Sequence, residues 1–358
     1  MKFKLSDICE YAKGKIKVSA LDENTYISTG NMLPNKSGIM QAASLPAQEQ
    51  TQAFMKNDVL VSNIRPYFKK IWYATFNGGC SNDVLVFRAK NGINSRFLHY
   101  VLADDSFFDY SMATSKGTKM PRGDKKAIME YEVPKFSYED QGKIAGILKV
   151  LDEKKELNAS INKNLEEQAT ALFDSYFPST ATGDHTVGEY ITPKRGKGLL
   201  SKNAVPGDVP VVAGGLEPAT YHNVANTQAP VLTISASGAN AGYVNLWHIP
   251  VWSSDSSYID VSMTSDVYFW YVLLKKRQKE IFDAQTGSAQ PHIYPQHIAA
   301  MPITEISSED IKNFNNSVSP LFSMIGANIA ESRTLASLRD SLLPRLMSGE
   351  LDVFNIDL

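Results

Sequence analysis

The chain contains one large internal repeat whose two copies lie 170 positions apart. Residues 137–140 (SYED) match residues 307–310 (SSED), and the same offset matches four further pairs: Gly117 with Gly287, Pro121 with Pro291, Ile128 with Ile298, and Val133 with Ile303. A repeat of this size is a whole domain and not a solenoid unit, which spans about 20 to 50 residues. The chain is therefore expected to fold as two similar halves.

The match continues upstream with a drifting offset. Residues 59–60 correspond to 231–232, residues 81–83 to 254–256, and residues 5–15 (LSDICEYAKGK) to 187–197 (VGEYITPKRGK). Insertions therefore separate matched blocks whose order is kept. A chance match at one block is plausible, but an ordered series of blocks indicates duplication.

Length and composition agree with two folded domains. A chain of 358 residues exceeds one ordinary core, and 43% hydrophobic with 21% charged residues is typical of globular proteins. The net charge of -2 means that any nucleic-acid surface must be a local patch. Cys9 and Cys80 form no CxxC pair, which favours a reducing compartment. The start lacks the apolar run of a signal peptide, and no stretch reaches the roughly 18 apolar residues of a membrane helix, so we expect a cytoplasmic protein.

A long helix is expected after each matched serine. Ser137 and Ser307 stand at N-cap positions, with acidic residues in the first turn that suit the helix dipole. Steps of four and three then select a heptad seam in each stretch: Ile144, Leu148, Leu151, Lys155, Asn158, Asn162, Leu165, Ala169, Leu172 and Tyr176, and Phe314, Val318, Leu321, Ile325, Asn328, Ser332, Leu335, Arg339, Leu342 and Leu346. This spacing predicts a coiled coil. A helix of about 40 residues spans roughly 60 Å and needs another to pack on.

The polar middle of both seams predicts how the helices pair. Antiparallel packing with Asn158 opposite Asn328 brings five further pairs together: Leu151 with Leu335, Leu165 with Leu321, Ile144 with Leu342, Leu172 with Phe314, and Lys155 with Glu331. Buried polar pairs stabilise little but disfavour shifted registers. This predicts a defined distance between the domains. The alternative is two separate amphipathic helices, each lying on its own domain.

These observations predict an α+β (mixed α/β) protein with pseudo-two-fold symmetry. The expected parts are a first globular domain at 1–136, a first long helix at 137–177, a second globular domain at 178–306, a second long helix at 307–349 and a tail at 350–358.

Positive charge is concentrated in three loop-like segments that are candidates for DNA contact. Glycine and proline mark each as loop, and loops on a rigid scaffold are common recognition sites. Phosphate contacts need cations, and base edges need polar side chains within reach of a groove. The candidates are Arg65, Lys69 and Lys70, then Lys116, Lys119, Arg122, Lys125 and Lys126, and then Lys194, Arg195 and Lys197. The alternative is an ordinary solvated surface.

The second half has different chemistry at the matched loops. Its candidates are Ser235, Ser237, Asn240 and Tyr243, which align with the Arg65 region, and Gln290, His292 and His297, which align with residues 119–127. A matched scaffold with unmatched loops is what two readers of different DNA sequences require. The alternative for each of these side chains is a turn or packing role.

Motifs of catalysis are largely missing. Residues 63–67 (NIRPY) only partly match the Asn-Pro-Pro-Tyr motif of amino-methyltransferases, and no glycine-rich loop precedes them. No Walker-type phosphate loop and no GxSxG elbow is present, although a hydrolytic triad has no fixed signature and stays open. His292 and His297 lack the further ligands of a zinc site, so no metal is expected.

The assembled features resemble the specificity subunits of type I restriction-modification systems, over essentially the whole chain. The most specific segments are 117–134 (GTKMPRGDKKAIMEYEVP), 136–141 (FSYEDQ), 144–169 (IAGILKVLDEKKELNASINKNLEEQA) and 338–353 (LRDSLLPRLMSGELDV). The resemblance implies that each domain is a target-recognition domain for one half of a split, asymmetric site on double-stranded DNA, and that the helices act as a ruler. The chain is somewhat shorter than many relatives, which suggests a trimmed recognition loop.

The resemblance also implies partners. Two modification subunits would supply S-adenosylmethionine and methylate adenine, and restriction subunits would supply ATP- and Mg-dependent translocation and cleavage, so this chain would be non-catalytic and bind no cofactor itself. Leu157, Ile161 and Ile329 beside the seam would face a modification subunit. Two rival hypotheses are a coiled-coil adaptor with protein-binding end domains and an intrinsic nuclease or methyltransferase.

Overall fold

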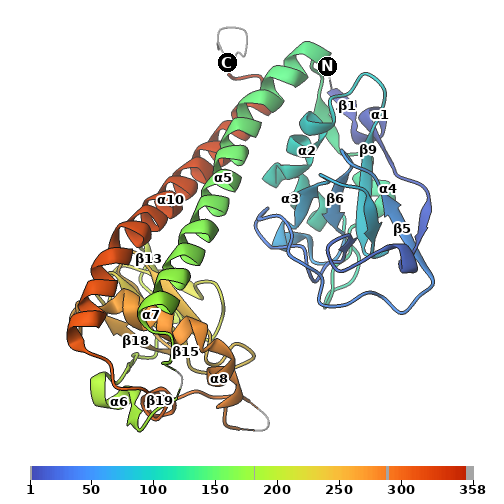
Figure 1. Ribbon diagram of the computed structural model, residues 1–358. Coiled ribbons are helices and arrows are strands. Elements are labelled where there is room, and N and C mark those ends of the chain that lie inside the picture. The colour runs from blue at the N-terminus through green and yellow to red at the C-terminus, as the bar shows by residue number, and fades with distance from the viewer. Residues whose placement is uncertain (1, 181, 288–289, 352–358) are drawn as a thin grey trace. The chain divides into compact units, whose positions relative to one another are not determined.

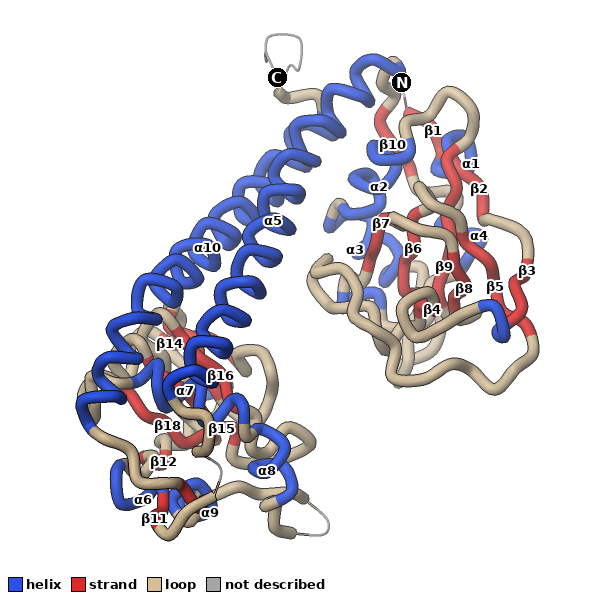
Figure 2. The backbone as a smooth tube through the Cα atoms, in the orientation of Figure 1, coloured by secondary structure: helices blue, strands red, loops and turns tan. Residues whose placement is uncertain are grey.

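The computed structural model describes residues 2–180, 182–287 and 290–351, and the chain divides into two compact units. Unit 1 comprises residues 1–155 and 333–358, and unit 2 comprises residues 156–332. The division passes through both long helices. The ribbon in Figure 1 follows the chain from blue to red, and Figure 2 shows which segments are helix, strand and loop.

Unit 1 contains two four-stranded sheets and a small two-stranded one. The strand orders are β2-β9-β6-β7, β3-β5-β8-β4 and β1-β10. The strands are β1 (Lys2–Lys4), β2 (Cys9–Tyr11), β3 (Lys15–Lys17), β4 (Tyr26–Ile27), β5 (Gln50–Phe54), β6 (Val59–Ser62), β7 (Ile71–Tyr73), β8 (Gly78–Cys80), β9 (Val84–Ala89) and β10 (Glu132–Pro134). All four residues of β6 are buried, as expected for a central strand of β-branched and aliphatic residues.

Four short helices complete the globular part of unit 1 in the described residues: α1 (Leu5–Ile8), α2 (Ser95–Ala103), α3 (Asp105–Ala113) and α4 (Lys125–Ile128). The Asn94 side chain accepts hydrogen bonds from the amides of Arg96 and Phe97 and so caps α2. Helix α2 packs on β6, β7 and β9. The apolar face of α2 therefore joins Val59, Val61 and Phe87 in one core.

Unit 2 repeats this plan. Its sheets have the orders β12-β18-β15-β16, β14-β13-β17 and β11-β19. The elements are β11 (His185–Thr186), α6 (Val187–Tyr190), β12 (Lys194–Arg195), β13 (Val209–Val212), β14 (Thr220–His222), β15 (Val231–Ser235), β16 (Val244–Trp247), β17 (Trp252–Ser253), β18 (Ser256–Asp260), α7 (Val267–Lys276), α8 (Gln278–Asp283), α9 (Pro295–Ala299) and β19 (Pro302–Ile303).

The first sheets of the two units have the same order in equivalent strands. Strands β6 and β15 hold the same place, each between a hairpin partner (β7 or β16) and a longer antiparallel partner (β9 or β18). Helix α7 packs on β15 and β16 as α2 packs on β6 and β7. The second sheets differ, with four strands in unit 1 and three in unit 2. The duplication seen in the sequence is therefore a duplication of fold, and the insertions lie in the second sheet.

The two long helices are α5 (Tyr138–Tyr176) and α10 (Ser308–Ser348). The Ser137 hydroxyl accepts a hydrogen bond from the amide of Asp140, and the Ser307 hydroxyl accepts from the amides of Glu309 and Asp310. Both expected N-caps are confirmed. The expected α+β class, with a long helix after each globular part, is also confirmed (Figure 1).

Within unit 2, the second half of α5 and the first half of α10 run antiparallel around buried asparagines. The Asn158 Nδ2 donates to the carboxylate of Glu331 at 2.7 Å and lies 3.4 Å from the main-chain oxygen of Asn328. The Asn328 Nδ2 donates to Asn162 Oδ1 at 2.8 Å. The two asparagines thus lie side by side, but each amide bonds a neighbouring group instead of the other amide. The side chains of a helix lean toward its N-terminus, which accounts for this offset.

Within unit 1, the first half of α5 and the last part of α10 pack through Ile144, Leu148, Leu343 and Leu346. Leu342 packs beside this cluster. The predicted pair of Lys155 and Glu331 would join residues of different units and stays a prediction. Lys155 Nζ lies 3.7 Å from Asp152 on its own helix.

Neither long helix, nor any other helix among the described residues, combines the length and the apolar character that a membrane span requires.

Candidate DNA interface

Two loops that carry most of the predicted DNA contacts of unit 1 are joined to each other by main-chain hydrogen bonds. We call them the β6 loop (residues 63–70) and the α3–α4 loop (residues 114–124). The amide of Arg65 donates to the carbonyl of Pro121 at 2.8 Å, and the amide of Gly123 donates to the carbonyl of Asn63. Lys116 and Arg122 exchange two main-chain hydrogen bonds of 2.9 Å across the α3–α4 loop. The two segments therefore form one surface.

Unit 2 has the same arrangement in its β15 loop (residues 236–243) and its α8–α9 loop (residues 284–294, with 288–289 outside the described residues). The amide of Gly238 donates to the carbonyl of Pro291, and the amide of Ile293 donates to the carbonyl of Ala236. Thr286 and His292 exchange two main-chain hydrogen bonds, as Lys116 and Arg122 do. The scaffold under both candidate surfaces is thus the same, although the side chains on it differ.

The β6 loop has an unusual backbone for its composition. Arg65 and Lys69 both have φ of 51°, in the left-handed region that side chains other than glycine seldom adopt. They flank a single 3-10 turn, Pro66–Phe68, whose exposed Tyr67 and Phe68 rings contact each other at a tilt, with centroids 4.7 Å apart. Backbone strain of this kind is often found at functional sites. The exposed aromatic pair was missed by the sequence analysis, because an aromatic residue in a loop more often packs inward.

Two of the predicted cations of the β6 loop are held by the protein itself. Lys69 Nζ lies 2.8 Å from the carboxylate of Asp105, and Lys70 Nζ donates to the carbonyl of Thr29 at 2.6 Å. Burial lowers the pKa of Lys70 from its ordinary value. The Nε of Arg65 is buried without a hydrogen-bond partner among the described residues. These three side chains are therefore less open to solvent than their sequence context suggests.

The α3–α4 loop and the start of α4 present the exposed cations. The exposed residues are Lys116, Lys119, Arg122, Lys125 and Lys126. Of these, Lys116 pairs with Asp124, and Arg122 pairs with Asp83 at 3.2 Å. The bond to Lys116 is the largest cause that lowers the pKa of Asp124, to about 2. The Asp124 side chain also caps α4, so the loop end is rigid.

The candidates of the β15 loop occupy several environments. Ser235 is buried at the end of β15, whereas Ser237 is partly exposed and its hydroxyl bonds the carboxylate of Asp255. Asn240 Nδ2 lies 3.4 Å from the carbonyl of Gly214. The ammonium of Lys275 lies over the Tyr243 ring, 4.3 Å from its centroid.

The candidates of the α8–α9 loop include exposed Gln290 and two partly buried histidines. The His292 ring stacks on Tyr294 with a centroid distance of 5.9 Å, and His297 packs edge-on against the same ring. Among the described residues, no group of three or more His, Cys, Asp or Glu side chains is placed to hold a metal ion.

The third predicted segment, with Lys194, Arg195 and Lys197, lies beside the β15 loop. Its strand β12 pairs with β18, Lys194 opposite Tyr258 and Arg195 opposite Ser257, and all three cations are exposed. The Arg195 Nη2 donates to Asp255 Oδ1 at 2.6 Å. Asp83 and Asp255 were missed as site residues, because the match of 81–83 with 254–256 aligns Asp83 with Ser256. The strand pairing aligns it with Asp255, since Ser62 pairs with Val84 and Ser235 pairs with Ser256.

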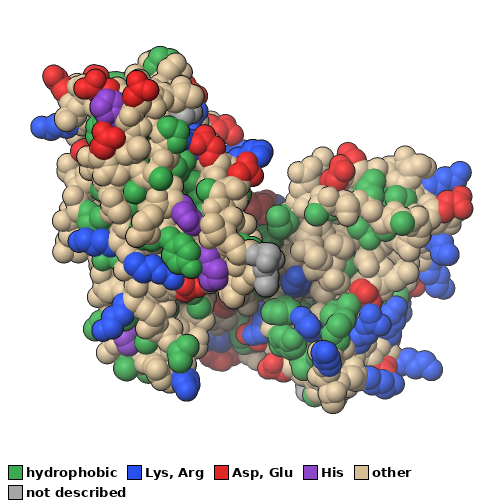
Figure 3. Space-filling model, turned by 90° about the horizontal axis from the view of Figure 1, so that it is seen from below, with side chains coloured by type: hydrophobic (Ala, Val, Ile, Leu, Met, Phe, Trp, Pro, Cys, Tyr) green, Lys and Arg blue, Asp and Glu red, His purple; other side chains and the backbone are tan. Residues whose placement is uncertain are grey.

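The space-filling view in Figure 3 shows these differences of composition. Lys and Arg side chains lie beside one another on the surface of unit 1, and several His side chains lie on the surface of unit 2. Cations, amides, hydroxyls and exposed rings are the groups that contact phosphates and base edges. Each of the two loop surfaces therefore carries groups suited to binding a nucleic acid.

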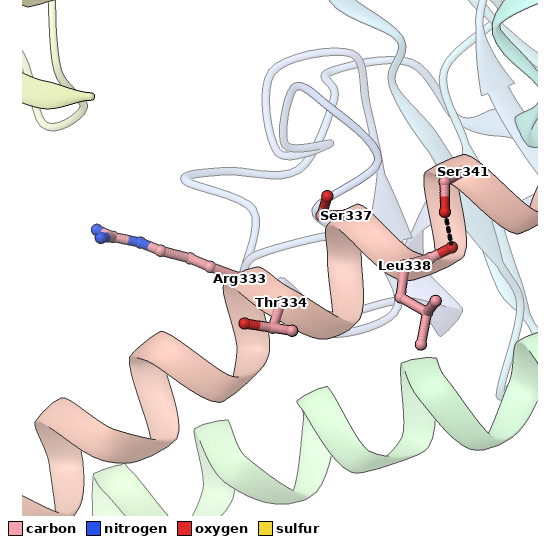
Figure 4. A pocket seen from close by; sticks show the side chains of 5 residues that line it. All are labelled: Arg333, Thr334, Ser337, Leu338 and Ser341. Carbon is pink, nitrogen blue, oxygen red and sulfur yellow. Dashed lines mark hydrogen bonds between the residues drawn. The ribbon is translucent and has the colours of Figure 1, made fainter. Parts of the chain in front are cut away.

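A separate shallow hollow lies on α10, within unit 1. It has a volume of about 520 Å³ and is lined by Arg333, Thr334, Ser337, Leu338 and Ser341 (Figure 4). The Ser341 hydroxyl is bonded to the carbonyl of Leu338 at 2.8 Å, and the Arg333 side chain points away from the other lining groups. None of these residues is a predicted DNA contact.

Comparisons with known proteins agree with this interpretation. Residues 1–167 match the family model described as type I restriction modification DNA specificity domain. The type I restriction enzyme MjaIX specificity subunit of Methanocaldococcus jannaschii is 24% identical over 322 residues, which are 78% of this chain and 73% of that protein. The HindI specificity subunit of Haemophilus influenzae is 30% identical over 186 residues, 49% of this chain and 40% of that protein.

A solved structure shows the same fold over nearly the whole chain. The type I restriction-modification S subunit from M. genitalium superimposes with a TM-score of 0.56 at 20% identity, covering 97% of this chain and 96% of that one. The duplicated fold, the family model and the specificity subunits among the relatives all lead to the same assignment. Residues 1–167 match the type I restriction modification DNA specificity domain, and the chain as a whole is similar to type I restriction-modification specificity subunits.

Proposed function

We propose that this chain is the DNA sequence-recognition subunit of a type I restriction-modification complex, and that it acts in the cytoplasm on a bipartite, asymmetric site. The observation that carries the proposal is the pair of loop surfaces on one duplicated scaffold. The β6 and β15 loops are joined to their partner loops by equivalent main-chain bonds, yet the two loop surfaces present Lys119 and Arg122 in unit 1 and Ser237 and His292 in unit 2. Equal scaffolds with unequal side chains suit the recognition of two different half-sites.

The domain division fits this role. Residues 1–136 and 178–306 are the two target-recognition domains, residues 137–177 and 307–349 are the spacer helices, and residues 350–358 are a tail. The helices act as a ruler between the half-sites. Asn158 and Asn328 support a fixed register, because a shift would place these buried amides against leucine side chains.

Methylation and cleavage belong to partner subunits in this proposal. Two modification subunits bring S-adenosylmethionine, and restriction subunits bring ATP and Mg²⁺. The helix surface offers a docking face for the modification subunits, since Leu157 is 53% exposed and Ile161 is partly exposed beside the seam. Ile329 packs partly against the unit 2 core and presents less surface.

The test is methylome sequencing of a host that carries the gene with its modification gene, compared with a host that carries the modification gene alone. We expect a bipartite methyl-adenine motif in the first host only. A system that methylates the same motif in both hosts contradicts the proposal.

A second measurement separates DNA recognition from the adaptor hypothesis. The affinity of the complex with modification subunits is measured for a duplex that contains the motif and for one that lacks it, over a range of salt concentrations. DNA recognition is supported if the duplex with the motif binds more tightly and the logarithm of its binding constant falls linearly with the logarithm of the salt concentration. Equal retention of both duplexes would favour the adaptor. Turnover by the isolated chain on DNA with S-adenosylmethionine or Mg²⁺ would favour an intrinsic enzyme.

A further inference from the structure

Each unit places one aspartate at the same point of the scaffold. Asp83 directly precedes β9 and Asp255 directly precedes β18. The carbonyl of Asp83 accepts from the amide of Asn63, the residue after β6, and the carbonyl of Asp255 accepts from the amide of Ala236, the residue after β15. The two acids are therefore structurally equivalent, and each lies where its unit's loops meet.

Each aspartate holds the guanidinium of one exposed arginine. In unit 1, Arg122 Nη2 lies 3.2 Å from Asp83 Oδ1 and 3.4 Å from Oδ2. In unit 2, Arg195 Nη2 lies 2.6 Å from Asp255 Oδ1. The Nε and Nη1 groups of both arginines donate to no described residue, and both side chains are about half exposed. Each arginine is thus anchored through one nitrogen and keeps free donors.

The arginines come from loops that are not equivalent. Arg122 lies on the α3–α4 loop and matches His292 in the repeat, whereas Arg195 lies on β12 and matches Lys13. Both stand on ordered backbone, Arg122 in its two bonds with Lys116 and Arg195 in its pairing with β18. The aspartate occupies the same position in both units, but the arginine bound to it comes from a different element in each. The ion pair is therefore not a simple copy retained from the duplication.

Stability gives no sufficient reason for these pairs. An exposed ion pair adds little to the free energy of folding, because both partners are well solvated and lose side-chain entropy when they pair. An arginine whose orientation is fixed, in contrast, loses less entropy when it makes two parallel hydrogen bonds to a planar partner. In the major groove, the base that offers two adjacent acceptors to arginine is guanine, through O6 and N7.

We propose that Asp83 and Asp255 are positioning residues that orient Arg122 and Arg195 to read one guanine in each half-site. This inference rests on the proposed function and adds which side chains carry base specificity. Because the two arginines come from elements that are not equivalent, each reaches its guanine from a different part of the scaffold. The two half-sites are therefore expected to differ. The remaining cations, among them Lys119 and Lys126, then contact phosphates without regard to sequence.

The experiment selects binding sites from a random duplex library with the complex of this chain and its modification subunits, and measures affinity for a duplex without the motif. For Arg195→Gln we expect discrimination at one base pair of one half-site to fall by about five- to a hundredfold. For Asp255→Asn we expect a severalfold fall at the same base pair, with affinity for the duplex without the motif unchanged or raised. Asp83→Asn and Arg122→Gln should act on the other half-site. Asp208→Asn, an exposed acid of unit 2, is the matched control.

The outcomes separate the possible roles. If the aspartate has only a structural role, its substitution should lower the affinity for duplexes with and without the motif together. If it only repels DNA by its charge, its substitution should raise both affinities together. Either result overturns the inference. Arg195→Lys keeps the charge but loses the two-donor fork, so it tests the same base pair should Asp255→Asn fail to fold. An unchanged motif in these variants overturns this inference alone. A wild-type complex that selects no motif overturns the proposed function as well.

Discussion

Arg339 Nη1 of α10 donates to Asp152 Oδ1 of α5 at 2.8 Å, within the seam of unit 1. The two side chains are only 9% and 19% exposed, and Asp152 also accepts from the Tyr100 hydroxyl at 3.0 Å. Burial alone would raise the pKa of Asp152, but Arg339 outweighs it and the pKa is lowered. The equivalent positions of unit 2, 170 residues away, are Ala169 and Phe322, both within its apolar core.

This relationship predicts a strongly non-additive pair of substitutions. Arg339→Leu and Asp152→Leu should each lower the free energy of unfolding by up to about 3 kcal/mol, since each removes the buried partner of a buried charge. Asp152 then keeps only its longer contact with Lys155, and Arg339 keeps only its bonds to the exposed Asp340. The double variant should recover most of the loss, as the apolar pair of unit 2 suggests. Urea unfolding followed by circular dichroism measures this. Lys279→Ala, which breaks an exposed ion pair with Asp283, serves as the control and should cause no measurable loss. Additive losses would contradict the prediction.

The partly buried His99 predicts a loss of stability in mild acid. Burial, helped by Arg96 and opposed by Asp152, lowers the pKa of His99 to about 3. The unfolded chain takes up a proton below pH about 6.5, whereas the folded chain stays neutral, so stability is lost as the pH falls. Between pH 7 and pH 5 the loss should be at most about 2 kcal/mol. Denaturant unfolding at both pH values should show this loss in the wild type. In His99→Gln the free energy of unfolding should differ much less between the two pH values.

His185→Gln is the control for that experiment. His185 is exposed, and its hydrogen bond to Glu189 raises the pKa of the imidazole, so its contribution has the opposite sign. The fall in stability below pH 6.5 should therefore remain in this variant. An equal fall in the wild type and in His99→Gln would show that other groups cause it.

The pairing of α5 and α10 in unit 2 predicts a specific crosslink. Cysteines at positions 158 and 328 should form a disulfide in the folded monomer under mild oxidation, because Asn158 Nδ2 lies within 3.4 Å of the Asn328 carbonyl. The combination of Asn158→Cys with Ala327→Cys should not crosslink, since Ala327 is exposed on another face of α10. Gel mobility without reductant gives the result. A crosslink only between two chains would indicate intermolecular pairing.

The exposed lysines of unit 1 predict a change in salt dependence without a change in motif. Lys119→Gln and Lys126→Gln should each weaken binding to all sequences and lower the slope of log affinity against log salt by about 0.9. Filter binding of the complex over a salt series measures the slope. Lys163→Gln on α5, where the lysine is exposed, is the control and should leave the slope unchanged. Loss of the motif in either variant would assign that lysine to base recognition instead.

Much of the fold could be predicted because its signals are local or periodic. Ser137 and Ser307 cap their helices through bonds to residues two or three positions away, so the motif itself is sufficient. The heptad spacing placed Asn158 and Asn328 in one seam, since a helix turns by a constant angle per residue. The partners of the two amides were not predictable, because Glu331 and Asn162 are reached through side-chain direction and not through spacing.

The sequence by itself determined that the chain is duplicated, where the long helices begin and which side chains share their seam. Only the tertiary structure decided which cations are free. Lys69 is paired with Asp105, 36 positions away, and Arg195 with Asp255, 60 positions away. The physical reason is that hydrophobic periodicity and capping act over a few residues, whereas an ion pair depends on the distance between charges that the folded chain brings together.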